Sequence, residues 1–167
     1  MPRRLLARCQ PDSIREFRAA ARQRFDDGIS LASAGQRTGA IYLWGYTAEM
    51  MLKAGYFAVI GLADTTIVAR SDLRAAINRG RSMGIAWLHQ GAGHNVRAWA
   101  ELLVAVRALA PATALPYWLA VEVQRRGQRV GQLWNETLRY RENYAYLHEL
   151  RQVREATGWL LVNSHLL

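Results

Sequence analysis

The sequence predicts an all-α fold, an antiparallel up-and-down bundle of about five or six helices. Apolar residues recur at steps of three and four along most of the chain, and no strand-like alternation extends beyond residues 65–69. The expected helices have short connections, which favours antiparallel neighbours. With 167 residues, 51% of them hydrophobic, the chain can bury one core. We expect residues 1–12 to be an N-terminal extension and residues 13–167 to form a single domain.

The first expected helix begins after Ser13. Ser13 and Glu16 have the spacing of a capping box, which closes a helix N-terminus. Gly35 is expected to end this helix. Its apolar stripe consists of Ile14, Phe17, Ala21, Phe25, Ile29 and Ala32.

The second expected helix covers residues 40–60 and is apolar on all faces, which is typical of a buried helix. Thr38 is its expected cap. Residues 41–63 are about as long as a membrane span. However, Glu49 and Lys53 lie near the middle, and charges at a bilayer centre are costly. We therefore expect a buried central helix with these two residues as an i,i+4 pair, and no membrane.

Four further helices are expected along the rest of the chain. Ser71 and Asp72 are expected to cap the third, and a loop marked by glycines 80, 84, 91 and 93 follows it. Asn95 begins the fourth helix, and Pro116 suits the first position of the fifth. The apolar stripe of the last helix is Leu147, Leu150, Val153, Thr157 and Leu160.

The chain is strongly basic, with 22 lysines and arginines against 13 aspartates and glutamates, a formal net charge of +9. All the cations except Lys53 are arginines, which suit bidentate contact with phosphate or carboxylate. RNA or an acidic protein is thus an expected partner, although a coding bias toward arginine explains the composition equally well. The single cysteine, Cys9, cannot form an intrachain disulfide, and we expect no signal peptide and a cytoplasmic protein.

Three motifs occur in a fixed order. Residues 38–54 read TGAIYLWGYTAEMMLKA, residues 93–96 read GHNV and are followed by two leucines at 102–103, and Trp134 precedes an Arg-Tyr pair at 139–140. Together they resemble the HEPN family of small bacterial and archaeal helical proteins, over roughly residues 15–165. The block around Gly-Tyr-x-x-Glu-x-x-Leu-Lys is the most specific of the three.

The resemblance implies a helical bundle that is usually a homodimer and is associated with RNA. Many members are metal-independent ribonucleases, and some are toxins paired with a small nucleotidyltransferase as antitoxin. Others are non-catalytic interaction modules that bind RNA, a nucleotide or a minimal nucleotidyltransferase. The resemblance implies no cofactor and no metal.

Arg141 and His148 have the family's catalytic spacing, with six residues between them. If the last helix covers both, they lie two turns or ~10 Å apart on one face. His148 would then exchange a proton with a ribose 2′-hydroxyl, and Arg141 would offset charge on the phosphate. The alternative is a solvated helix face, because arginines are abundant here and the acidic Glu142 follows Arg141.

A second set of residues is expected to contact RNA, by charge or by stacking on bases. The alternatives are a solvated face for the arginines, packing at a helix junction for the tyrosines, and a buried pair with Glu49 for the arginine at 139. His89 and His94 lack a third ligand at zinc spacing, so no metal site is expected. The RNA-binding candidates are Arg125, Arg126, Arg129, Arg139, Tyr140 and Tyr144.

Overall fold

The computed structural model describes residues 12–87 and 93–167, and in these ranges the chain is an all-α bundle with six α-helices. This confirms the predicted fold class. Apart from Asp12, the proposed extension lies outside the described residues. The helices are α1 (Ile14–Ser33), α2 (Arg37–Val59), α3 (Arg70–Ser82), α4 (Val96–Arg107), α5 (Tyr117–Leu133) and α6 (Leu147–Val162). Short 3₁₀ turns are η3 (Pro111–Thr113), η4 (Glu136–Tyr140) and η5 (Ser164–Leu166).

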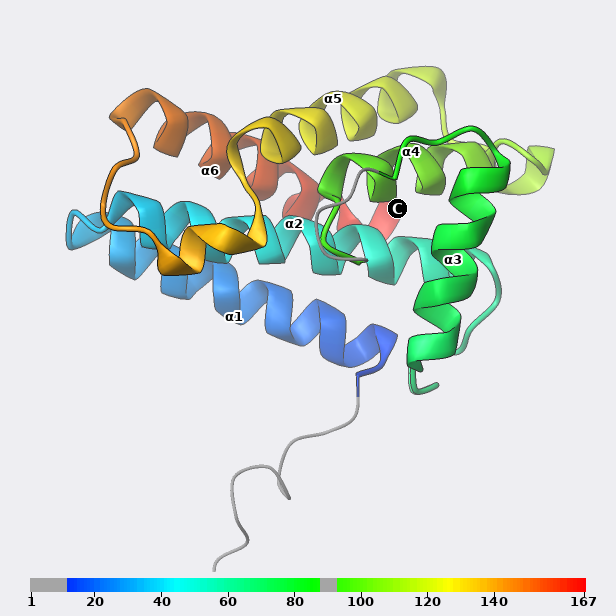
Figure 1. Cartoon of the computed structure of the whole chain (residues 1–167). Helices are drawn as coiled ribbons and strands as arrows, with labels where there is room; N and C mark the ends of the chain where they lie inside the picture. Colours follow the sequence, from blue (N-terminus) through cyan, green and yellow to red (C-terminus); the bar gives the residue numbers. More distant parts are fainter. Residues whose placement is uncertain (1–11, 88–92) are drawn as a thin grey trace, which may run out of the picture.

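Helices α1 and α2 lie lengthwise against each other and run in opposite directions (Figure 1). The Trp44 indole donates to the carbonyl of Phe25 at 3.0 Å, and the Thr47 hydroxyl donates to the carbonyl of Ala21 at 3.1 Å. Residue numbers rise along one helix while they fall along the other. The predicted antiparallel arrangement is therefore present for the first helix pair.

Helices α2 and α4, in contrast, run in the same direction. Glu49 of α2 contacts His94 at the start of α4, and Phe57, further along α2, packs against Trp99 with ring centroids 6.1 Å apart. Between them in sequence, α3 stands across one end of the bundle at a steep angle to the other helices (Figure 1). The up-and-down pattern is thus interrupted at α3.

The centre of the core is α2, which α1, α4 and α6 cover. Trp44, Leu52 and Phe57 are almost fully buried, as expected for a helix that is apolar on all faces. The Glu49 carboxylate accepts a hydrogen bond from the Lys53 ammonium, which confirms the predicted i,i+4 pair. No helix in the described parts of the chain is long and apolar enough to cross a membrane.

Two of the predicted helix starts are wrong. Helix α2 begins at Arg37, and Thr38 lies inside it, so Thr38 is not the cap. Helix α3 begins at Arg70, and the carboxylate of Asp72 accepts the N–H of Ala69 at 2.8 Å, so Asp72 stabilises this start from within the helix. Thr38 does not cap the helix because its hydroxyl accepts a hydrogen bond from the backbone N–H of Ala145, which is distant in the sequence.

Two smaller differences concern a glycine and a proline. Gly80 is part of α3, where its missing side chain admits the Trp87 ring, so it does not mark the loop that follows. Pro116 caps α5, which begins one residue later at Tyr117. The caps at Ser13 and Asn95 are as predicted, because each side chain accepts the backbone N–H three residues on.

Candidate functional site

The predicted catalytic pair lies where the chain passes from α5 to α6. After α5, the Trp134 indole donates to the carbonyl of Tyr42 at 2.9 Å, and Asn135 caps η4. The chain then continues to α6 in a segment tied to the start of α2 by Asn143. The Asn143 amide donates to the carbonyl of Gly35 at 2.8 Å and accepts the N–H of Thr38 at 3.1 Å. We call residues 139–148 the junction segment.

Arg141 and His148 do not share a helix face, which corrects the premise of the sequence argument. Helix α6 begins at Leu147, and the Glu149 carboxylate accepts the N–H of Tyr146 at 2.7 Å to close its N-terminus. Arg141 lies in the connection before the helix. The ~10 Å separation expected for two helix turns therefore does not apply.

Tyr146 nevertheless has a relation to both candidate catalytic residues. Arg141 and His148 are both exposed. The Tyr146 ring stacks on the His148 imidazole, with centroids 5.7 Å apart and planes 11° from parallel. The same tyrosine and Arg141 line one cavity. The Tyr146 ring thus lies against His148, and Tyr146 lines the cavity that Arg141 also lines.

This cavity, which we call the junction cavity, has a volume of about 350 Å³. Its walls come from the start of α2, the end of α5, η4 and the start of α6. They combine aliphatic side chains with two tyrosines, one arginine and one carboxylate. The lining residues are Thr38, Ile41, Leu133, Leu138, Arg141, Tyr144, Ala145, Tyr146 and Glu149.

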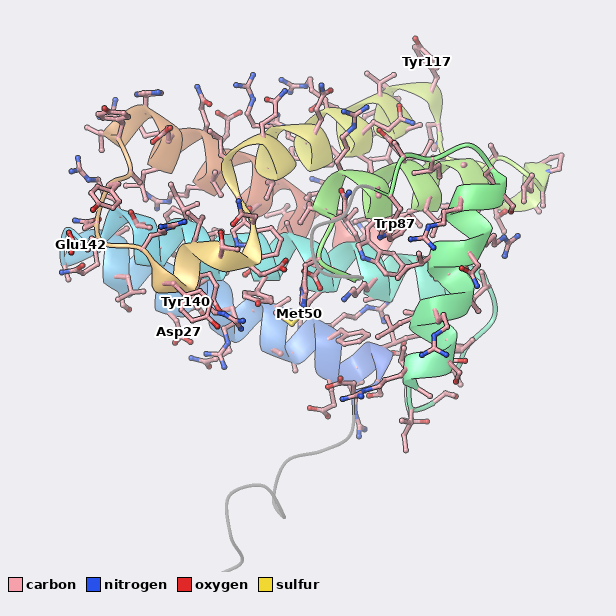
Figure 2. All side chains as sticks on the ribbon, viewed as in Figure 1. Asp27, Met50, Trp87, Tyr117, Tyr140 and Glu142 are labelled. Atoms are coloured by element: carbon pink, nitrogen blue, oxygen red, sulfur yellow. The ribbon has the colours of Figure 1, made fainter. Side chains whose placement is uncertain are left out.

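The tyrosines of the junction segment are exposed and do not pack in the helix junction. Tyr140, Tyr144 and Tyr146 are 72%, 69% and 66% exposed. The Arg139 guanidinium lies over the Tyr140 ring, 4.6 Å from its centroid. Figure 2 shows Tyr140 and Glu142 at the same end of the molecule. Flat rings open to solvent beside arginines are suited to stacking on bases.

Arg139 does not form the buried pair with Glu49 that the sequence left open. Both oxygens of the Glu49 carboxylate are used by other partners, Oε1 by the Lys53 ammonium and Oε2 by Nδ1 of His94 at 2.9 Å. Arg139 is exposed instead. Its charge is therefore available at the surface of the junction segment.

The three arginines predicted on the fifth helix are held by nearby polar side chains. Arg125 and Arg126 both bind Glu122, and Arg126 also binds Glu155 at 2.7 Å. Arg129 donates to Gln152 at 3.0 Å. Hydrogen bonding to the Arg125 guanidinium lowers the pKa of the Glu122 carboxyl, so this acid stays ionised. Two carboxylates thus offset much of the positive charge of this cluster.

Glu49, Lys53 and His94 form an ionic network near the start of α4. The sequence predicted the pair of Glu49 and Lys53 but not the contact with His94. The hydrogen bond that the His94 ring donates to the Glu49 carboxylate raises the pKa of His94, which favours the cationic ring, and the nearby Glu136 acts in the same direction. Tyr46 packs edge-on against the His94 ring at 5.7 Å, and burial raises the pKa of its hydroxyl. A cationic imidazole that is fixed by a carboxylate can donate a hydrogen bond but is a poor base. His89 lies outside the described residues.

The sequence reading also missed arginines on α3. Arg70, Arg74 and Arg81 line a surface hollow of about 440 Å³ with Leu73 and Ile77. No described carboxylate forms an ion pair with these arginines. The signal was present in the spacing, because residues four and eleven apart return to one side of a helix.

Comparison with known proteins gives no family for the chain: no family model, no curated protein and no solved structure matches it.

Proposed function

We propose that the chain is an RNA-associated protein that binds single-stranded RNA through the junction segment. The observation that carries this proposal is that the junction segment exposes three tyrosines, Tyr140, Tyr144 and Tyr146, together with Arg139 and Arg141. Aromatic rings that face solvent are the means by which proteins stack unpaired bases, and arginines hold the phosphates between them. The resemblance to HEPN proteins supports the same proposal.

The expected energetics are those of a stacking platform on a basic protein. Each base stacked on an aromatic ring contributes ~1–3 kcal/mol, measured by alanine substitution. A guanidinium on a phosphate adds ~1.5–3 kcal/mol. The net charge of +9 attracts a polyanion at long range, so binding weakens as salt rises.

Fluorescence anisotropy with a short labelled single-stranded RNA tests the proposal. Tyr144→Ala is expected to weaken binding by about 5- to 150-fold, the range that corresponds to ~1–3 kcal/mol. Arg141→Ala is expected to weaken it by tenfold or more. Arg22→Ala removes an exposed arginine from α1 and serves as the control for net charge. Equal losses in all three variants would mean that binding is not localised to the junction segment.

A metal-independent ribonuclease is a second candidate, favoured by Tyr146, whose ring stacks on His148 and which lines the same cavity as Arg141. If RNA binds across Tyr146, the His148 imidazole would lie near a ribose 2′-hydroxyl and the Arg141 guanidinium near the adjacent phosphate. His148 would accept the 2′-hydroxyl proton as that oxygen attacks the adjacent phosphorus. The 5′-oxygen leaves and takes a proton from water, His148 returns its proton to water, and the products are a 2′,3′-cyclic phosphate and a 5′-hydroxyl. Arg141 would offset charge on the phosphate oxygens.

Cleavage of RNA in the presence of a chelator separates this candidate from simple binding. His148→Ala and Arg141→Ala are expected to abolish cleavage, while His165→Ala, an exposed histidine of η5, leaves it unchanged. If the wild-type protein leaves RNA intact and its expression does not affect growth, the ribonuclease proposal fails and the binding proposal remains.

A protein-docking role is a third candidate, with a second copy of the chain or a minimal nucleotidyltransferase as partner. It is favoured by Tyr117, which is 86% exposed and points away from the bundle in Figure 2, and by the neighbouring exposed Trp118. Sedimentation velocity is expected to show a dimer that Trp118→Ala weakens. If the protein is a monomer at all concentrations, the second copy of the chain is excluded as the partner of this surface, and only a different protein remains.

A further inference from the structure

We propose that the junction cavity is a subsite for one guanine base of single-stranded RNA, read by the carboxylate of Glu149. This inference rests on the proposed RNA binding and goes beyond it, because it assigns base specificity to a residue that the sequence did not single out.

The volume and the apolar walls of the cavity suit a planar base. Its volume of about 350 Å³ lies at the lower end of the range for small-molecule sites. Ile41, Leu133 and Leu138 provide aliphatic contacts from three different elements. Aliphatic side chains can cover the two faces of a base, which form no hydrogen bonds. The edge of the base carries its polar groups and needs a hydrogen-bond partner in the cavity. The polar edge of the base therefore decides which base is bound.

Among the residues that the structure describes, Glu149 is the one carboxylate that lines this cavity. Its Oε2 accepts the N–H of Tyr146 at 2.7 Å, which fixes the position of the carboxylate at the cavity wall. An ionised carboxylate has about four acceptor sites, so one hydrogen bond leaves both oxygens able to accept more. The cavity thus presents a fixed, negatively charged acceptor and demands N–H donors from its occupant.

Guanine meets this demand best among the four bases. Its Watson–Crick edge places two N–H donors, N1–H and N2–H, side by side, which matches the two oxygens of a carboxylate. Adenine and cytosine offer an amino donor beside a ring-nitrogen acceptor that the carboxylate would repel. Uracil offers one donor between two carbonyls. Burying an unmatched acceptor against a carboxylate is costly, so the discrimination is steep.

The rim of the cavity supplies contacts for the rest of the nucleotide. Arg141 lines the same cavity and can hold a phosphate attached to the bound nucleoside. Tyr144 and Tyr146, also on the rim, can stack the adjacent bases outside. A guanosine within a strand would then be held at its base, its phosphate and its neighbours.

The purely structural role of Glu149, closing the N-terminus of α6, can be separated from base recognition. Glutamine also serves at this third helical position, because its side-chain oxygen accepts the same backbone N–H. Glu149→Gln therefore keeps the helix start. It replaces one acceptor with an NH₂ donor, which faces the donors of guanine unfavourably. Glu16→Gln changes the equivalent position of α1 and is the matched control.

The experiment compares two labelled RNAs of equal length, a uridine tract and the same tract with one central guanosine. We expect the wild-type protein to bind the guanosine RNA about 5- to 150-fold more tightly, the range for one bidentate base contact. Glu149→Gln is expected to erase this preference, so that the two RNAs bind with equal affinity. Glu16→Gln is expected to keep the preference.

A second variant, Ala145→Leu, narrows the cavity and is expected to remove the preference without changing Glu149. Equal affinity of the wild-type protein for both RNAs would overturn the guanine subsite and leave the RNA-binding proposal intact. A preference that persists in Glu149→Gln would overturn it as well. Failure to bind either RNA would overturn both proposals.

Discussion

Replacement of Glu49 by leucine removes the anion from the buried network between α2 and α4. Glu49 is only 2% exposed, and its carboxylate accepts hydrogen bonds from both Lys53 and His94. Leucine has a similar volume, so the packing of α2 is kept. The Lys53 ammonium, on a residue 7% exposed, is left without a carboxylate partner.

The expected loss of stability is ~3–5 kcal/mol, the cost of breaking a buried ion pair by removal of one partner. Lys53 keeps a contact with the Trp99 ring, 5.4 Å from its centroid, which favours the lower part of this range. For a chain of this length, each kcal/mol shifts the melting temperature by ~2–4 °C. The melting temperature should therefore fall by about 6–20 °C.

Urea denaturation followed by circular dichroism measures the effect. Glu101→Leu is the matched control, because Glu101 forms an i,i+4 pair with Arg97 at 2.7 Å on the exposed side of α4. Its loss should cost only ~0.3–0.5 kcal/mol. The double variant Glu49→Leu/Lys53→Met should recover most of the loss, since no unpaired ammonium remains. If Glu49→Leu costs no more than Glu101→Leu, the buried network does not stabilise the fold.

Three further outcomes are expected. The hydrogen bond to Glu49 raises the folded-state pKa of His94 above 6.5. This bond should therefore stabilise the protein fully below about pH 6.5, and its contribution should be lost as the pH rises through the folded-state pKa. The difference in urea midpoint between wild type and His94→Gln should accordingly shrink from acid to alkaline pH. Gly45→Ala should destabilise by ~1–3 kcal/mol in the same assay, because its methyl group would overlap the Trp134 ring, and a gain in stability would contradict the packing described. Glu142→Gln should tighten RNA binding, because it removes an exposed negative charge from the junction segment, and should reduce the salt dependence of the affinity only slightly. An unchanged or weaker affinity in the anisotropy assay would mean that RNA binds elsewhere on the protein.

The parts of the fold that local signals control could be read from the sequence. The caps at Ser13 and Asn95 use a side chain and an N–H only three residues apart, at 3.2 and 2.9 Å. The pair of Glu49 and Lys53 is one helix turn apart. In each case the interacting groups are neighbours in the chain, so their spacing contains the information.

Contacts between distant residues could not be read in this way. Thr38 has the residue type of a cap, but its hydroxyl accepts the N–H of Ala145 at 3.0 Å, and its own N–H is taken by Asn143. Arg141 lies before α6, in the segment that these contacts anchor. Nothing in the local sequence around Thr38 indicates partners more than a hundred residues away.

The candidate site shows the same division. The types and spacing of Arg141, His148 and Tyr144 made them candidates, but whether Tyr144 packs inside or faces solvent depends on the three-dimensional course of the junction segment. The junction cavity was not foreseen, because its walls come from segments separated along the chain. Glu149 had only the properties of a residue in the first turn of a helix.

Ultraviolet crosslinking of bound single-stranded RNA, followed by trypsin digestion and mass spectrometry, tests the central claim most directly. Trypsin releases residues 142–151 as one peptide, which contains Tyr144, Tyr146 and His148. RNA adducts concentrated on this peptide are the predicted result. Adducts confined to peptides of α3, with its arginines at 70, 74 and 81, or spread evenly over the chain would contradict the assignment of RNA binding to the junction segment.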